Sequence, residues 1–148
     1  NENLTKNIIK KVKNNFSKKI YIDRGDSTSN QGLMRKITND QEIKFQLEKI
    51  GFQIVKLSHF SLENQIQIFQ NAEVIVGLHG GGFANLIFCK PNTKVIELKP
   101  SGAGLVISNL AERCELNYEV ISKKPENIEQ NNQQGLIKVG IEEILKKI

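Results

Sequence analysis

The sequence predicts an α/β fold of three layers, in which helices cover both faces of a mostly parallel, five-stranded sheet. Short apolar segments of strand type alternate with segments of helical spacing at five positions along the chain. This alternation is typical of parallel sheets, because the connection between two parallel strands usually contains a helix. The 148 residues suffice for one domain with a buried core, so we expect a single domain.

Composition and charge exclude several classes of protein. A hydrophobic content of 39% and a charged content of 25% are ordinary for a globular protein. No apolar run approaches the roughly 20 residues of a membrane-spanning helix, so we expect no transmembrane segment in this chain. The net charge of +5 favours anionic ligands, but the lysines are dispersed and form no stripe with aromatic residues. Nucleic-acid binding is therefore not expected.

The start of the chain leaves its compartment open. The first residue is Asn1 and no apolar signal region follows it, so we expect an excised domain or a trimmed product. Such a protein would be cytoplasmic or membrane-associated in a bacterium, and would lie in the lumen of the secretory pathway in a eukaryote.

The first elements are expected to be a helix, a strand and a second helix. Ile20 to Asp23 is the first predicted strand. Thr38 can cap the next helix with Gln41 as its capping-box partner, and Gly51 can end that helix. Helical spacing also marks the beginning of the chain, at Leu4, Ile8, Ile9, Val12 and Phe16.

Four more strands follow. Phe52 to Leu57 alternates in polarity and is expected near a sheet edge, and Ser61 can cap the helix after it. The remaining elements are predicted in this order: strand three at Val74 to Val76, a glycine turn, a helix from Phe83, strand four at Lys94 to Leu98, a helix from Ser101 to Cys114, strand five at Leu116 to Ile121, a polar surface loop from Lys123 to Gln134, and a last helix over Ile137, Ile141, Ile144 and Leu145.

We expect the strand order 2-1-3-4-5, which is Rossmann-like. In this order the loops after strands one and three lie side by side at the switch point, where a ligand crevice opens. The first loop begins with Arg24, whose planar guanidinium suits phosphate oxygens, although a surface pair between Arg24 and Asp26 explains it equally well. The two loops together predict a site for an anion, and a nucleotide fits best.

The second loop carries His79 and three consecutive glycines, Gly80 to Gly82. Glycines let backbone N–H groups approach a ligand, and the N-terminus of a helix carries partial positive charge. His79 would add a titratable donor. The alternative is that the glycines only allow close packing of strand and helix, with His79 a capped loop residue. His59 is expected to be a loop or capping residue.

Taken in order, four segments resemble the carboxyl half of glycosyltransferase family 61, a group of enzymes with the GT-B fold. The residues Arg24, His79, Gly80, Gly82, Asn85 and Glu97 match the family pattern, whereas Leu78, Gly81 and Phe83-Ala84 stand where the family often has proline, alanine and leucine-threonine. The four segments are I-Y-I-D-R-G-D-S-T-S, R-K-I-T-N-D-Q-E-I, G-F-Q-I-V-K-L and the stretch from Leu62 to Leu98.

The resemblance implies a binding site for a nucleotide-sugar donor, such as a UDP-sugar. His79 would be catalytic and, with the glycine turn, would stabilise the charge on the leaving nucleotide. Glu97 would accept hydrogen bonds from ribose or sugar hydroxyls, unless it is only a surface carboxylate at a strand end. The remaining implied donor-binding residues are Arg24, Ser27, Thr28, Ser29, Gly80, Gly81, Gly82 and Asn85.

The implied reaction is sugar transfer with inversion to a glycan or glycoprotein acceptor, in polysaccharide biosynthesis for example. No metal and no cofactor are expected, because a GT-B site stabilises the diphosphate with protein donors, and the chain has neither D-x-D nor a His/Cys cluster. GT-B enzymes place much of the acceptor site in an N-terminal domain, for which this chain is too short. We therefore expect the donor-binding half of a hexosyl- or pentosyltransferase, with a missing N-terminal partner domain and no assigned base.

Two other functions are compatible with the same fold. A non-catalytic nucleotide-binding or regulatory module would use the same crevice. A Rossmann dehydrogenase or methyltransferase fits less well, because the glycines follow the third strand and no G-x-G-x-x-G opens the chain.

Overall fold

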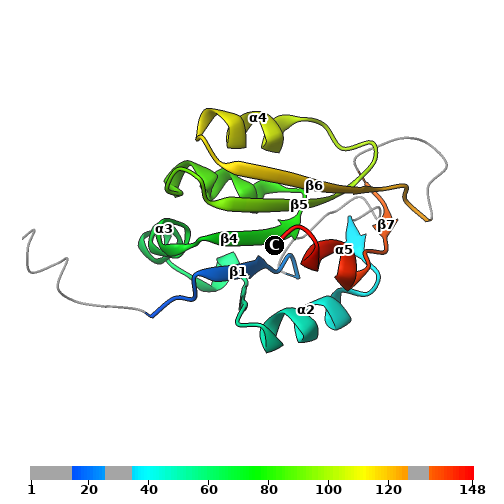
Figure 1. Ribbon diagram of the computed structural model, residues 1–148, viewed down its shortest axis with the longest axis horizontal. Helices are drawn as coiled ribbons and strands as arrows, with labels where there is room; N and C mark the ends of the chain where they lie inside the picture. Colours follow the sequence, from blue (N-terminus) through cyan, green and yellow to red (C-terminus); the bar gives the residue numbers. More distant parts are fainter. Residues whose placement is uncertain (1–14, 26–34, 127–133) are drawn as a thin grey trace, which may run out of the picture.

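The computed structural model describes residues 15–25, 35–126 and 134–148. Its main feature is a five-stranded, entirely parallel sheet in the order β3-β1-β4-β5-β6. The strands are β1 Lys19–Ile22, β3 Gln53–Val55, β4 Val74–Leu78, β5 Lys94–Pro100 and β6 Asn117–Lys123. These are the five predicted strands, and the predicted order 2-1-3-4-5 is confirmed, because β3, the second of the five along the chain, pairs with β1 at the sheet edge. Figure 1 shows β1, β4, β5 and β6 in this order.

Helices cover both faces of this sheet. One core packs α2 and α5 against the face that carries Tyr21, Val76 and Ile96. The other packs α3, η2 and α4 against the face that carries Ile75 and Val95. The helices are α2 Asp40–Lys49, α3 Leu62–Asn71, α4 Val106–Arg113 and α5 Ile141–Leu145, and the 3₁₀ helices are η1 Leu57–His59 and η2 Gly81–Phe88. Alternate residues of each strand face opposite cores, which gives three layers.

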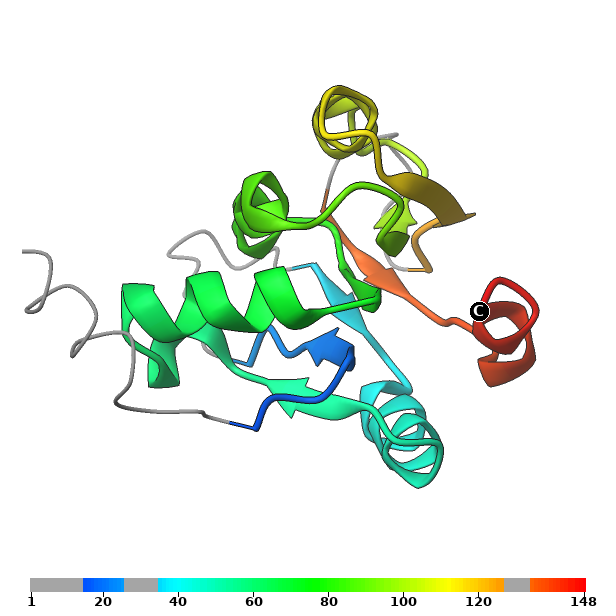
Figure 2. The same cartoon turned by 60° about the vertical axis from the view of Figure 1, so that its left-hand side comes forward.

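A second, two-stranded parallel sheet was not predicted. It pairs β2 (Lys36–Ile37) with β7 (Leu136–Ile137), which Figure 2 shows in cyan and orange beside each other. The last helix was predicted to include Ile137, which is wrong, because Ile137 lies in β7 and α5 begins only at Ile141. Spacing alone missed β7, since its partner strand lies about 100 residues earlier in the chain.

The predicted capping box at Thr38 is also wrong. The Thr38 N–H donates to the carbonyl of Ile137, 2.8 Å away, and Asn39 is the N-cap of α2. The Asn39 side chain makes no capping bond. It instead donates to the carbonyl of Val139 (2.6 Å) and accepts from the Val139 N–H (3.2 Å). The second sheet therefore continues into a side-chain bridge at the start of α2.

The helix predicted from Phe83 is a 3₁₀ helix that begins two residues earlier, at Gly81. Phe83 and Leu86 are buried three residues apart, which matches three residues per turn, whereas Ile87 is 59% exposed. Two other local predictions are confirmed. The Ser61 hydroxyl accepts from the Asn64 N–H at 3.2 Å, and Gly51 follows α2 with a φ of 94°.

Two predictions fall largely outside the described residues. They are the N-terminal helix, of which only Phe16 is described, and the middle of the polar segment, residues 127–133. Among the described residues, no helix combines the length and the apolar character needed to cross a membrane.

Candidate functional site

The loops after β1 and β4 lie side by side, as the strand order predicts. β1 and β4 are neighbours in the sheet, with Ile22 opposite Gly77. Just beyond them, Nη1 of Arg24 donates to the carbonyl oxygen of His79. The arginine turn and the histidine turn are therefore in direct contact at the carboxyl edge of the sheet.

The three glycines of the second loop have different surroundings. Gly80 packs against the guanidinium of Arg24, which leaves no room for a Cβ. A Cβ on Gly82 would lie 3.1 Å from the Ile22 side chain. A Cβ on Gly81 would meet nothing within 4 Å. Close packing thus explains Gly80 and Gly82, and the space in front of η2 opens at Gly81.

His79 belongs to a buried hydrogen-bonded group with Glu97 and Tyr118. Its Nδ1 lies 2.5 Å from Oε1 of Glu97, and the Tyr118 hydroxyl donates to Oε2 of the same carboxylate at 2.5 Å. The side chain of His79 is 10% exposed and that of Glu97 is fully buried. Burial, followed by the hydrogen bond and the charge of Glu97, raises the pKa of Tyr118, so the phenol keeps its proton.

The position of Glu97 excludes one of the two alternatives offered by the sequence. It is not a surface carboxylate, because it is fully buried in β5 between Gly77 and Val120 of the adjacent strands. Both of its oxygens are bonded inside the protein, to His79 and Tyr118, and ribose or sugar hydroxyls would have to compete with these donors. Without a ligand, the carboxylate contacts the histidine, and its contact with a donor stays a prediction.

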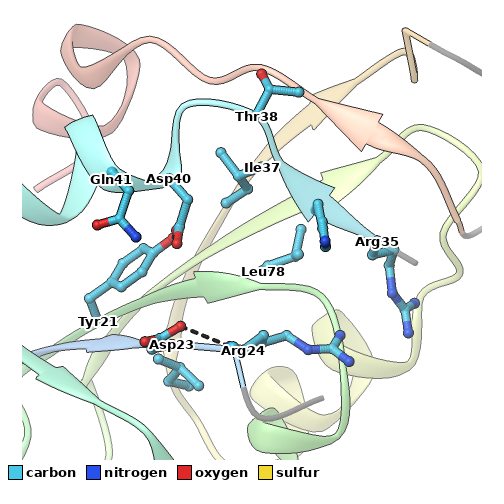
Figure 3. A pocket seen from close by; sticks show the side chains of 12 residues that line it. Tyr21, Asp23, Arg24, Arg35, Ile37, Thr38, Asp40, Gln41 and Leu78 are labelled. Carbon is cyan, nitrogen blue, oxygen red and sulfur yellow. Dashed lines mark hydrogen bonds between the residues drawn. The ribbon is translucent and has the colours of Figure 1, made fainter. Parts of the chain in front are cut away.

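A cavity of about 370 Å³ opens next to these loops (Figure 3). Its apolar lining includes Ile22, Ile37 and Leu78, and Arg24 stands at its rim. His79 and the three glycines do not line this cavity. They adjoin it through Arg24, which contacts both His79 and Gly80.

Arg35 also lines the cavity, and sequence reasoning gave it no role. Its Nε and Nη1 atoms are buried without a hydrogen-bond partner among the described residues. Burial, followed by repulsion from Arg24, lowers the pKa of Arg35, while Glu97 opposes the shift. Arg24 and Arg35 extend toward the same part of the cavity in Figure 3. Two cations that lie close together, one with buried unpartnered donors, have the chemistry to bind an anion.

At the opposite end of the cavity, the carboxylates are paired with a lysine. Nζ of Lys44 lies 3.0 Å from Asp23 and 2.8 Å from Asp40. The Tyr21 hydroxyl also donates to Asp40, at 2.5 Å. Burial, followed by the charge of Asp40, raises the pKa of Tyr21 well above its ordinary value. Because these carboxylates are paired, the excess positive charge lies at the arginine end.

The other predicted site residues lie elsewhere or outside the described chain. Asn85 in η2 donates to Oε1 of Gln65 in α3 at 3.1 Å, so its amide links two helices. Ser27, Thr28 and Ser29 fall outside the described residues. Within the described part, no group of three or more His, Cys, Asp or Glu side chains could hold a metal ion. A reaction without metal stays a prediction.

The parallel sheet and the cationic cavity at its carboxyl edge are those of a Rossmann-like domain. Comparison with known protein families places it more narrowly, because the family model described as Glycosyltransferase 61 matches residues 1–96. The chain belongs to glycosyltransferase family 61.

Two relatives found by comparison are plant enzymes. The chain is similar to a beta-1,2-xylosyltransferase of Arabidopsis thaliana, with 37% identity over 54 residues, which cover 35% of this chain and 10% of that protein. It is also similar to an alpha-1,3-arabinosyltransferase of Oryza sativa subsp. japonica, with 29% identity over 101 residues, which cover 60% of this chain and 16% of the relative. The chain therefore spans only a small part of the length of these relatives.

Proposed function

We propose that this chain is the donor-binding domain of an inverting glycosyltransferase with the GT-B fold. It would bind the diphosphate of a nucleotide sugar and serve the transfer of the sugar to a glycan or glycoprotein acceptor. The observation that carries this proposal is the convergence of Arg24 and Arg35 at one cavity, with Nε and Nη1 of Arg35 buried and unpartnered within the described chain.

The arginines supply the chemistry that a diphosphate needs. Guanidinium groups donate in planar pairs to phosphate oxygens, and they neutralise the charge that grows on the leaving nucleotide during transfer. In this proposal Arg35 binds the diphosphate through the donors it now leaves unused. Arg24 does so while it bridges to His79, and the backbone of Gly81 faces the open side. His79, which adjoins the cavity through Arg24, is the catalytic group of this proposal, and protein donors replace a metal.

The cavity and the relatives support the remaining features of the proposed donor. The apolar side chains Ile37 and Leu78 offer a surface for the nucleoside. The named activities of the relatives, xylosyl and arabinosyl transfer, support a pentose as the transferred sugar. An N-terminal domain outside this chain would bind the acceptor and supply the general base.

Titration of the protein with UDP and UDP-xylose, followed by NMR, tests the donor site. We expect saturable binding with chemical-shift changes at Arg24, Arg35 and the glycine turn. Arg35→Gln should weaken binding, whereas Arg113→Gln, which removes an exposed arginine of α4, should not. Absence of saturation at about millimolar ligand would mean a binding free energy weaker than about −4 kcal/mol, and this result would exclude the proposal. Binding without acceptor-dependent UDP release by the longer protein would favour a non-catalytic nucleotide-binding module.

A further inference from the structure

Three adjacent strands bring His79, Glu97 and Tyr118 to one face of the sheet. Gly77 is the register partner of Glu97, and His79 lies two residues beyond Gly77 on the same face. Tyr118 is opposite Val95, two residues before Glu97. The carboxylate of Glu97 is fully buried between the two rings. Its Oε1 lies 2.5 Å from Nδ1 of His79, and its Oε2 lies 2.5 Å from the Tyr118 hydroxyl.

We propose that Glu97 and Tyr118 are positioning residues, which hold the proton of neutral His79 on Nδ1 and thereby present Nε2 to the phosphate of a bound nucleotide sugar. The role of the phosphate rests on the proposed function. The tautomer of the histidine does not, because it follows from contacts within the unliganded protein.

The donor and acceptor inventory fixes this tautomer. With Glu97 as a carboxylate, which can only accept hydrogen bonds, the contact to Oε1 places a proton on Nδ1 of His79. Tyr118 keeps its own proton and donates it to Oε2, which prevents the carboxylate from rotating. Contacts between a carboxylate and one ring nitrogen orient histidines in many functional sites. The partner of that nitrogen decides whether the other nitrogen donates or accepts a hydrogen bond.

The charges around His79 indicate what happens when an anion arrives. Glu97 from β5 contacts the ring, and Arg24 from the loop after β1 donates to the His79 carbonyl. Tyr118 from β6 contacts Glu97, and Arg35 is close enough to interact with both Arg24 and Glu97. In the neutral ring, Nε2 has a lone pair and repels a phosphate oxygen. A bound diphosphate therefore favours transfer of a proton from solvent to Nε2, which produces an imidazolium between Glu97 and the phosphate.

This mechanism predicts that donor binding takes up a proton. UDP-xylose is the suitable probe, because its diphosphate is doubly substituted and does not titrate near neutral pH. We expect its affinity to fall by about tenfold as the pH rises from about 6 to about 8, because binding consumes a proton. Calorimetry in two buffers of different ionisation enthalpy should show the uptake directly.

The tautomer is tested without any ligand. The chain has two histidines, and His59→Gln leaves His79 as the sole source of imidazole ¹⁵N signals. At a pH where the ring is neutral, we expect the signature of a protonated Nδ1, whereas neutral histidine in water favours a protonated Nε2. A protonated Nε2 in the folded protein would overturn the proposal. If UDP-xylose fails to bind while Nδ1 is protonated, the proposed function fails and the positioning of His79 stands.

Variants separate positioning from a purely structural role. Glu97→Gln keeps the size of the side chain but removes its charge, and it should lower the affinity for UDP-xylose by about tenfold at neutral pH and abolish its pH dependence. Tyr118→Phe removes only one hydroxyl and should cause a loss of roughly threefold. His59→Gln is the control, since His59 is exposed in η1. Unchanged affinity and an unchanged pH profile in folded Glu97→Gln would refute the proposal. If Glu97→Gln does not fold, the affinity of Tyr118→Phe and the tautomer of His79 in the wild-type protein test the proposal in its place.

Discussion

The guanidinium of Arg24 occupies the space in which any side chain at position 80 would begin, so Arg24 and Gly80 fit together only because Gly80 has no Cβ. The same guanidinium donates to the carbonyl of His79. Gly80 is therefore the residue that lets the first loop reach the second. Its contribution to the site is room for another protein side chain, which a motif of consecutive glycines does not reveal.

The first prediction concerns this contact. Gly80→Ala should displace Arg24 from the histidine turn and weaken the binding of UDP by at least about tenfold, because a charge-assisted hydrogen bond contributes about 1.5–3 kcal/mol. Calorimetric titration and thermal unfolding measure both effects. Gly104→Ala is the matched control, since a Cβ there meets nothing within 4 Å. Normal UDP binding by Gly80→Ala would show that Arg24 can act from another position.

The second prediction distinguishes a ligand-binding arginine from a structural one. Arg35→Gln should lower UDP affinity by about ten- to a hundredfold, since it removes a two-pronged phosphate donor. It should leave the free energy of unfolding within about 1 kcal/mol of the parent, because Nε and Nη1 of Arg35 bond to none of the described residues. Chemical denaturation and UDP titration measure the two quantities. A large loss of stability with unchanged affinity would make Arg35 a structural residue.

Local patterns predicted the main sheet and its order because each strand is an apolar segment with its own turn signals. The strands of the smaller sheet have two residues each, too few for a periodic pattern. Their pairing depends on contacts across about 100 residues. For the same reason the sequence did not reveal Arg35, which lies at the cavity because it directly precedes β2. Arg24 and His79 could be predicted together because they follow neighbouring strands.

The environment of each predicted residue was harder to derive than its location. The family resemblance predicted a role for Glu97, yet one of its two partners is Tyr118, which is on a different strand. No local spacing relates residues 79, 97 and 118. Side-chain packing across three strands therefore decides whether a carboxylate faces a ligand or supports a neighbour.

The third prediction concerns the bridge between Asn39 and Val139. Asn39→Ala removes two hydrogen bonds that join the start of α2 to the C-terminal segment, and it should destabilise the fold by about 1–3 kcal/mol. Because β2 carries the cavity wall next to Arg35, UDP affinity should also fall. Asn109→Ala, at an exposed position of α4, should change neither quantity. Equal stability of the two variants in urea denaturation would mean that β2 is held by backbone pairing alone.

The last prediction is a pH dependence at the C-terminal helix. Glu143 accepts from the Lys123 ammonium and from the Gly140 N–H at the start of α5. The hydrogen bond from Lys123, followed by that from Gly140, lowers the pKa of Glu143 in the folded state. A lowered folded-state pKa means that the stabilisation is complete above the unfolded value of about 4.3 and is lost as the pH falls through the folded value. Glu143→Gln should therefore reduce stability by about 0.5–1 kcal/mol at neutral pH, and this difference from the parent should vanish once the pH lies below the folded-state pKa. Glu142→Gln, its exposed neighbour, is the control in urea denaturation at both pH values. A deficit of Glu143→Gln that persists in acid would show that its cause is lost packing, because the charge of Glu143 is absent there in both proteins.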